Sequence, residues 1–155
     1  MIVGAHVHGQ AKATLVLDND KLNYTITIPA YDLLGFEHVP NNKEQESIVQ
    51  STIDELQRHK KWLGFNADVC TLNTIKITNP FSGHHKKGSR NNNEHKDFEI
   101  IVNYLCKNSK KLKSVNVFTH HINSKIETIE LQWLAHNKQS LIIIKKDQQE
   151  VVFYD

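Results

Sequence analysis

The chain has 155 residues, of which 39% are hydrophobic and 23% charged, and this size and composition fit one globular domain. The formal net charge is +2, and the basic side chains are scattered along the chain, which argues against a nucleic-acid-binding surface. The longest apolar run, Leu141 to Ile144, is far shorter than the roughly 20 residues that cross a bilayer, so we expect no membrane insertion. The unusual feature is histidine, which occurs ten times, and we therefore look for function there.

The N-terminal part of the chain predicts a β-hairpin and then an ordered loop. From Ala5 to Leu17 apolar and polar residues alternate with a period of two, which is typical of a half-buried strand. Asn19-Asp20 is a turn signal, and the alternation resumes over residues 22–28 until Pro29 ends the pairing. Residues 31–40 follow neither a strand nor a helix period, so we predict a packed loop there.

One long helix is predicted after this loop. Asn41 or Asn42 can cap its first turn, where Glu44 and Glu46 also favour the positive end of the helix dipole. At 100° per residue one side of the helix is apolar, and it consists of Ile48, Val49, Thr52, Ile53, Leu56 and Leu63. Gly64 is expected to end the helix.

The second half of the chain predicts a meander of short strands. These are Cys70–Thr78, Phe98–Cys106, Ser114–Thr119, Ile126–Ala135, Leu141–Lys146 and Val151–Tyr154. The segment at about 79–96 is polar and aperiodic, and we expect it to be a mobile loop. Together these elements predict an α+β fold over residues 1–155: largely antiparallel sheets of about eight strands that can pack in two layers, with one long helix between strands two and three.

The opening His6-Val-His8 is the first candidate for metal binding. Two residues apart on a strand, both imidazoles would leave the same face about 6.6 Å apart, a span that two Zn–N bonds of about 2.0–2.1 Å can close. The alternative is a pair of solvated surface residues. Two ligands leave a tetrahedral ion half coordinated, so a metal site here needs ligands from elsewhere in the chain.

His95 and His38 are the best candidates for the remaining ligands. His95 is followed by Asp97 and Glu99, which would present one imidazole and two carboxylates on one face of a strand. Glu37-His38 lies between apolar residues that could hold it in place, although a single structural hydrogen bond would explain the same histidine. We expect His95 or His38 to complete the site, with one of the three acids as a fourth ligand or as an orienting group.

The other histidines are weaker candidates. His84 and His85 lie in the expected mobile loop and could recruit metal only loosely, as could His120 and His121 at the end of a predicted strand. His59 and His136, on the flank of the predicted helix and beside a turn, are expected to be structural, as are Trp62 and Trp133.

Three functional classes remain open from the residues alone. No His-Glu-x-x-His, Gly-x-Ser-x-Gly or phosphate-binding glycine loop occurs, so the first class is a metal-binding module without catalytic activity. The second is a zinc-dependent hydrolase with Glu37 or Glu99 as general base, and the third is a structural or adaptor domain with incidental histidines. Cys70 and Cys106 have no Cys-x-x-Cys spacing, and their separation leaves two buried thiols and one disulfide equally open.

Several motifs in linear order resemble the ZrgA family of zinc-regulated periplasmic proteins. They are His6-Val-His8-Gly9, Leu15–Asp18, Ile28-Pro29-Ala30, Asp32–Pro40 with its Gly-Phe-Glu-His-Val-Pro core, Cys70, His95-x-Asp97 and Tyr104-x-Cys106. The likeness covers nearly the whole chain. It implies a non-enzymatic, periplasmic protein that binds Zn²⁺, assists zinc uptake by scavenging or by hand-off to a zinc import transporter component, and has lost a signal peptide.

The resemblance also favours a disulfide between Cys70 and Cys106, because the periplasm is oxidising. The chain departs from the family in the segment at 79–96, which in relatives is dense in histidine and acids. Here that segment keeps only His84, His85, Glu94 and His95 of such residues and is otherwise mainly lysine, arginine and asparagine, which puts loose, high-capacity zinc binding in doubt. The oligomeric state and the affinity for zinc cannot be read from the sequence.

Overall fold

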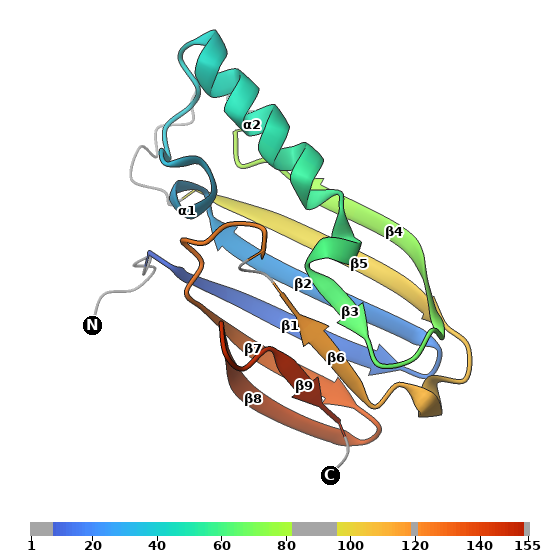
Figure 1. The fold of residues 1–155 in the computed structure, drawn as a ribbon. Helices are drawn as coiled ribbons and strands as arrows, with labels where there is room; N and C mark the ends of the chain where they lie inside the picture. Colours follow the sequence, from blue (N-terminus) through green and yellow to red (C-terminus); the bar gives the residue numbers. More distant parts are fainter. Residues whose placement is uncertain (1–7, 82–95, 119–120, 154–155) are drawn as a thin grey trace, which may run out of the picture.

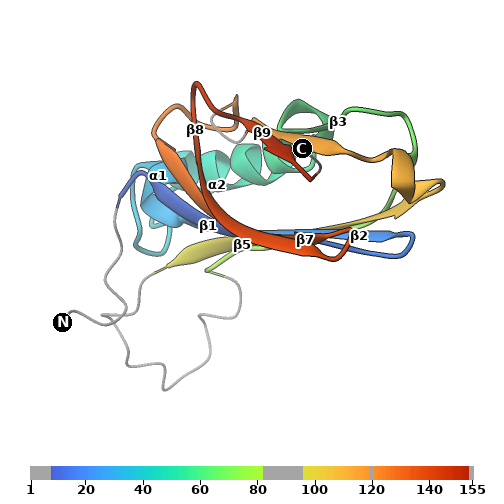
Figure 2. The same cartoon turned by 90° about the horizontal axis from the view of Figure 1, so that it is seen from below.

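The computed structural model describes residues 8–81, 96–118 and 121–153. These residues form nine strands in two sheets, which face each other with one helix alongside (Figures 1 and 2). The strands are β1 (Gln10–Asp18), β2 (Lys21–Pro29), β3 (Leu63–Phe65), β4 (Cys70–Thr78), β5 (Asp97–Cys106), β6 (Ser114–Val117), β7 (Thr128–Ala135), β8 (Lys138–Lys145) and β9 (Glu150–Val152). The helical segments are α1 (Ala30–Leu34), α2 (Lys43–Leu56) and the 3-10 turns η1 (His59–Lys61) and η2 (Ser109–Lys111).

The prediction of an α+β fold with one long helix was wrong, because the described residues form a mainly β protein. Helix α2 has 14 residues and ends at Leu56, well before the expected end at Gly64. The Trp62 indole N–H donates to the Leu56 carbonyl oxygen at 3.2 Å, which satisfies one acceptor at the C-terminus of the helix. Leu63–Phe65 pairs with β6 as strand β3. Residues that the sequence period assigned to the helix therefore belong to a strand, because they pair with a distant segment of the chain.

The start of α2 agrees with its sequence. Asn42 is the N-cap, and its side-chain oxygen accepts a hydrogen bond from the Gln45 backbone N–H at 2.8 Å. The Gln45 side chain in turn accepts from the Asn41 N–H at 3.0 Å. Val49 and Leu56 are the buried residues of the helix, and the apolar face that they define packs on the protein core.

The expected N-terminal hairpin is confirmed. Strand β1 pairs antiparallel with β2 from Asp18 opposite Lys21 to Lys12 opposite Thr27, and Asn19 adopts the left-handed conformation that this tight turn needs (φ 56°). The odd-numbered residues of β1 from position 11 onwards are buried, as the alternation predicts. Strand β1 begins at Gln10, directly after Gly9, whose φ of 87° turns the chain, and the first part of the predicted strand, residues 5–7, lies outside the described residues.

The large sheet has the strand order β4-β5-β2-β1-β7-β8. Strands β1 and β7 run parallel, with Gln10 opposite Thr128, although more than a hundred residues separate them in the chain. The small sheet has the order β3-β6-β9. The predicted meander is therefore wrong: β7 returns to the N-terminal strand, while β6 and β9 form a separate sheet with β3.

The core lies between the two sheets and beneath α2. Inward-facing aliphatic side chains of the large sheet are fully buried there, and each contributes about 1.5–3 kcal/mol to stability by leaving water. Aromatic pairs connect the layers, namely Tyr24 with Trp62, Phe65 with Tyr104, and Trp133 with Phe153.

A disulfide joins the edge strand β4 to β5. Cys70 and Cys106 stand directly opposite each other in the ladder, and their sulfur atoms are bonded. This confirms the pairing that the family resemblance favoured.

Candidate metal site

The candidate site lies at the end of the large sheet where β1 and β5 begin and β2 ends. The short helix α1 lies at this end of the sheet and occupies part of the segment that the sequence predicted as a loop. Helix α1 ends at Leu34, and Gly35 is its C-cap: it adopts the left-handed conformation (φ 85°), and its N–H donates to the Tyr31 carbonyl oxygen. The buried side chains of Leu33 and Leu34 anchor α1 to the core.

A buried carboxylate fixes the chain just before β1. Asp32 is only 3% exposed, and its Oδ2 accepts a hydrogen bond from the Gly9 N–H at 2.7 Å. The Gly9 carbonyl oxygen accepts from the N–H groups of Glu127 and Thr128 at 2.7 and 3.0 Å. Because Gly9 is held from α1 and from the start of β7, the position of His8 directly before it is also defined.

His8 lies against an aromatic side chain at this end of the sheet. Its imidazole stacks on the ring of Tyr31, with the ring centroids 4.6 Å apart and the planes 11° apart. Both residues are exposed, so this stack orients the imidazole without burying its nitrogen atoms. His8 directly precedes Gly9 and does not lie on a described strand, whereas His6 lies outside the described residues, so the spacing between the two imidazoles stays a prediction.

The start of β5 lies on the other side of β2. Asp97 pairs with Pro29, the last residue of β2, and the Ala30 N–H donates to the Lys96 carbonyl oxygen at 2.8 Å. Gly9 and Lys96, which directly precede β1 and β5, therefore flank the same end of β2. His95 directly precedes Lys96 in the chain but lies outside the described residues, as does His6.

The Glu37-His38 pair follows α1 and is exposed. The His38 ring packs on Phe36, with the centroids 5.2 Å apart. His38 Nδ1 is 2.9 Å from the Val39 carbonyl oxygen, which can only accept, so Nδ1–H is the donor. This tautomer leaves the lone pair on Nε2, the arrangement in which histidine binds metal while its other nitrogen is held by a carbonyl.

Two further predicted ligands, Glu99 and His121, lie among the described residues. Glu99 is exposed on the outer face of the large sheet, opposite Thr27 and two residues along β5 from Asp97. His121 is exposed and stacks on Phe118. The other secondary candidates, His84, His85 and His120, lie outside the described residues.

Among residues 8–81, 96–118 and 121–153, no three His, Cys, Asp or Glu side chains gather closely enough to hold a metal ion. The structure thus brings His8 and the first residues of β5 to one end of the sheet but does not assemble a full ligand set from the described side chains. Sequence analysis missed the roles of Tyr31, which stacks on His8, and of Asp32, which holds Gly9. The signal was the apolar pair before Gly35, a pattern typical of a helix C-terminus.

His59 and His136 have structural roles. His59 Nδ1 and the Tyr104 hydroxyl oxygen lie 2.8 Å apart and share a hydrogen bond beneath η1. Burial, and secondarily the charge of Lys60, lowers the pKa of His59, while burial raises the pKa of Tyr104. His136 Nε2–H donates to the Leu112 carbonyl oxygen at 2.8 Å, which agrees with the structural role predicted for His136.

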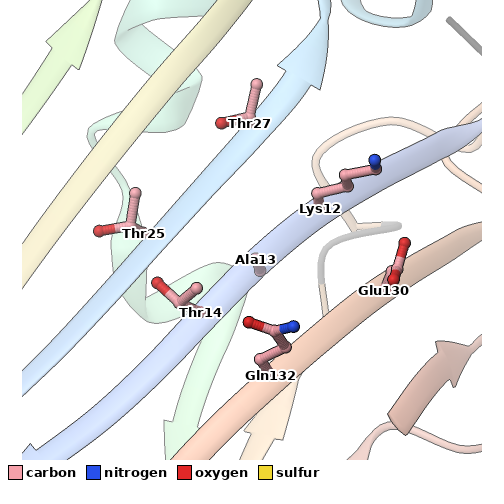
Figure 3. A pocket seen from close by; sticks show the side chains of 7 residues that line it. All are labelled: Lys12, Ala13, Thr14, Thr25, Thr27, Glu130 and Gln132. Atoms are coloured by element: carbon pink, nitrogen blue, oxygen red, sulfur yellow. The ribbon is translucent and has the colours of Figure 1, made fainter. Parts of the chain in front are cut away.

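A hollow of about 310 Å³ lies on the outer face of the large sheet, over strands β1, β2 and β7 (Figure 3). It is lined by Lys12, Ala13, Thr14, Thr25, Thr27, Glu130 and Gln132. Its only carboxylate is that of Glu130, and imidazole and thiolate are absent from this lining. Because Zn²⁺ in proteins is held mainly by such nitrogen and sulfur ligands, the hollow does not have the chemistry of a zinc site.

The two packed sheets define a mainly β protein, and the exposed His8 lies at one end of the larger sheet. The family model described as ZrgA family zinc uptake protein matches residues 5–153, nearly the whole chain. The chain therefore belongs to the ZrgA family of zinc uptake proteins. A comparison with curated proteins found no match. Within the described residues, no helix is long and apolar enough to span a membrane.

Proposed function

We propose that this protein binds Zn²⁺ in the periplasm and assists zinc uptake by scavenging the ion or handing it to a transporter component, without catalysing a reaction. The observation that carries the proposal is the family match over residues 5–153. The disulfide between Cys70 and Cys106 supports the compartment, because such bonds persist in oxidising environments and are rare in the cytosol.

The principal zinc site is proposed at the end of the sheet where β1 and β5 begin. Its ligands are His6 and His8 together with His95, or with His38 in its place. One carboxylate of Glu37, Asp97 or Glu99 acts as the fourth ligand or as an orienting group. Three features of the described residues support this choice: His8 is exposed and oriented by Tyr31, Gly9 is held in place, and the starts of β1 and β5 flank the same end of β2.

The decisive experiment is calorimetric titration of untagged protein with zinc, after removal of metal with a chelator. We expect His6→Ala combined with His8→Ala to abolish tight binding while the melting temperature in chelator stays unchanged. His84→Ala combined with His85→Ala is the matched control, because it removes the same number of imidazoles but should cost only weak additional binding. Tight binding that survives in the His6/His8 variant would move the site to His38 or to His120 and His121.

Zinc occupancy should depend on pH. Each imidazole must be neutral to bind the ion, so binding is expected to weaken as the pH falls below about 6.5. Titrations at several pH values, with the ionic strength held constant, measure this dependence. Affinity that is constant between pH 7.5 and about 5.5 would argue for a site made of carboxylates instead of histidines.

The absence of catalysis needs its own test. Glu37 and Glu99, the two candidate general bases, are both exposed, whereas catalytic bases usually act in sites from which water is excluded. Zinc-loaded protein should therefore leave ester, phosphate and peptide substrates intact. Turnover that is lost in Glu37→Gln or Glu99→Gln without loss of metal would replace our proposal with a zinc-dependent hydrolase.

A further inference from the structure

The loop that precedes β7 lies at the same end of the large sheet as the candidate metal site. Strand β7 is the parallel neighbour of β1, so the residues directly before these two strands stand side by side (Figure 1). The Gly9 carbonyl oxygen, which accepts from the Glu127 N–H, joins this loop to the chain next to His8. Asn123 Nδ2 donates to the Leu33 carbonyl oxygen at 3.4 Å. The loop is therefore attached both to the residue that follows His8 and to α1.

The backbone of this loop is held in place. Asn123 forms a turn in which its side-chain oxygen accepts from the Lys125 N–H at 2.9 Å and its carbonyl oxygen accepts from the Ile126 N–H at 3.1 Å. Ile126 is only 3% exposed and anchors the loop to the core. Because Glu127 directly follows Ile126 and directly precedes β7, its side chain starts from a defined position.

The carboxyl group of Glu127 lies beside Gly9. The Cγ and Cδ atoms of Glu127 are each 3.5 Å from the position that a Cβ atom would take on Gly9. Since consecutive Cα atoms are about 3.8 Å apart, the Glu127 Cδ atom lies within about 9 Å of the His8 Cα atom. Zn²⁺ binds imidazole nitrogen and carboxylate oxygen atoms at about 2.0–2.2 Å, so one ion can be shared by these two side chains.

The Glu127 carboxylate is available for an ion. The side chain is exposed, and within residues 8–81, 96–118 and 121–153 its carboxylate makes no hydrogen bond or ion pair. Asp97 and Glu99 are less well placed relative to His8, because β2 separates β5 from β1 and two strand spacings of about 4.8 Å lie between them. Glu127 precedes the strand next to β1, so only one such spacing separates its backbone from that of Gly9.

We propose that Glu127 is a further carboxylate ligand of the zinc site and binds the ion together with the His8 imidazole. This inference rests on the proposed function, because it names a ligand of the same site. One imidazole and one carboxylate provide two of the four ligands of a tetrahedral zinc ion. The carboxylate also offsets part of the positive charge of the ion, which neutral imidazoles do not do.

Calorimetric titration of untagged, metal-free protein with zinc chloride tests this ligand. Glu127→Gln keeps the size of the side chain but removes its charge, and it should weaken zinc binding roughly tenfold or more. Glu130→Gln is the matched control, because Glu130 lies further along β7 on the outer face of the large sheet and its loss should leave zinc affinity unchanged. Because the Glu127 side chain is exposed, the melting temperature of Glu127→Gln in chelator should equal that of the wild type.

A replacement ligand distinguishes zinc binding from a structural role of the carboxylate. Glu127→His places an imidazole where the carboxylate was and should recover most of the affinity that Glu127→Gln loses, since imidazole is also a zinc ligand. The inference is overturned if Glu127→Gln binds zinc like the wild type or if Glu130→Gln is equally damaging. It is also overturned if Glu127→His binds zinc as weakly as Glu127→Gln.

The same titrations separate this inference from the proposed function. If the wild-type protein binds zinc tightly through His6 and His8 while Glu127→Gln leaves the affinity unchanged, only the assignment of Glu127 fails. If the wild-type protein does not bind zinc tightly, the proposed function and the assignment of Glu127 fail together.

Discussion

Strand β5 has two ends of opposite character. At its start, Asp97 lies opposite Pro29 at the end of β2, and the exposed His8 precedes β1 on the other side of β2. At its other end, Tyr104 packs on Phe65, and Cys106 is bonded to Cys70. One end of β5 carries the disulfide and an aromatic contact, whereas the other is joined to the start of α1 by the hydrogen bond from the Ala30 N–H to the Lys96 carbonyl oxygen. The disulfide and the proposed zinc site therefore lie at opposite ends of the same strand.

Two histidines illustrate this difference. His8 and His59 each contact a tyrosine ring, with centroid distances of 4.6 and 5.6 Å. His8 is stacked and exposed, so its nitrogen atoms can still bind a metal ion. His59 is half-buried, shares a hydrogen bond with the Tyr104 hydroxyl group and has a lowered pKa. The environment of the imidazole, rather than the residue type, separates a candidate ligand from a structural group.

The largest effect is expected at the end of β5 that carries the disulfide. Replacing Cys70 and Cys106 together by serine removes a cross-link between residues 36 apart and should lower the free energy of unfolding by about 4 kcal/mol on the chain-entropy model. Urea unfolding under non-reducing conditions measures the loss. Zinc affinity of the folded variant should stay unchanged, and a parallel loss of zinc affinity would show that the two ends are coupled.

The next largest effect is expected at the hydrogen bond from the Gly9 N–H to the Asp32 carboxylate, which we call the clamp. Asp32→Ala leaves the buried Gly9 N–H without its acceptor and should lower the free energy of unfolding by about 1–3 kcal/mol. It should also weaken zinc binding, since His8 follows the position of Gly9. Asp32→Asn keeps an acceptor oxygen and is the control for the hydrogen bond. Wild-type zinc affinity in the alanine variant would show that the clamp is not part of the site.

A smaller effect is expected from the stacked tyrosine. Tyr31→Ala removes the aromatic contact with His8, which is worth about 0.5–1.5 kcal/mol, and should weaken zinc binding by roughly twofold to tenfold. Tyr31→Phe keeps the ring and should retain the affinity. Calorimetric titration of both variants distinguishes the loss of stacking from the loss of the hydroxyl group. Equal weakening in both would assign the effect to the hydroxyl group instead.

The smallest effect concerns pH and the half-buried histidine. Because the pKa of His59 is lowered from its ordinary value of 6.5 in the folded protein, the unfolded chain binds the proton more readily. Stability is therefore fully present above pH 6.5 and declines as the pH falls from 6.5 toward the folded-state pKa. His59→Gln should flatten this part of the profile of unfolding free energy against pH. An unchanged profile would assign the dependence to other histidines.

Local pattern was sufficient for the elements in which burial alternates regularly. The period of two along β1 and β2 and the Asn19-Asp20 turn predicted a hairpin that the structure contains, because side-chain alternation decides which face of a strand is buried. The strand Cys70–Thr78 was also predicted with the bounds of β4. The family resemblance rested on linear motifs and needed no tertiary information.

Only the tertiary structure decided where these elements meet. The helix period continued to Leu63, but pairing of Leu63–Phe65 with β6 ended α2 earlier, and β7 paired parallel to β1 across most of the chain. Such contacts depend on packing between distant segments and leave no local period in the sequence. For the same reason the sequence determined only which side chains could bind zinc. The hydrogen bond between Asp32 and Gly9 and the stacking of His8 on Tyr31 depend on the packing of α1 beside the end of β2, which the sequence did not predict.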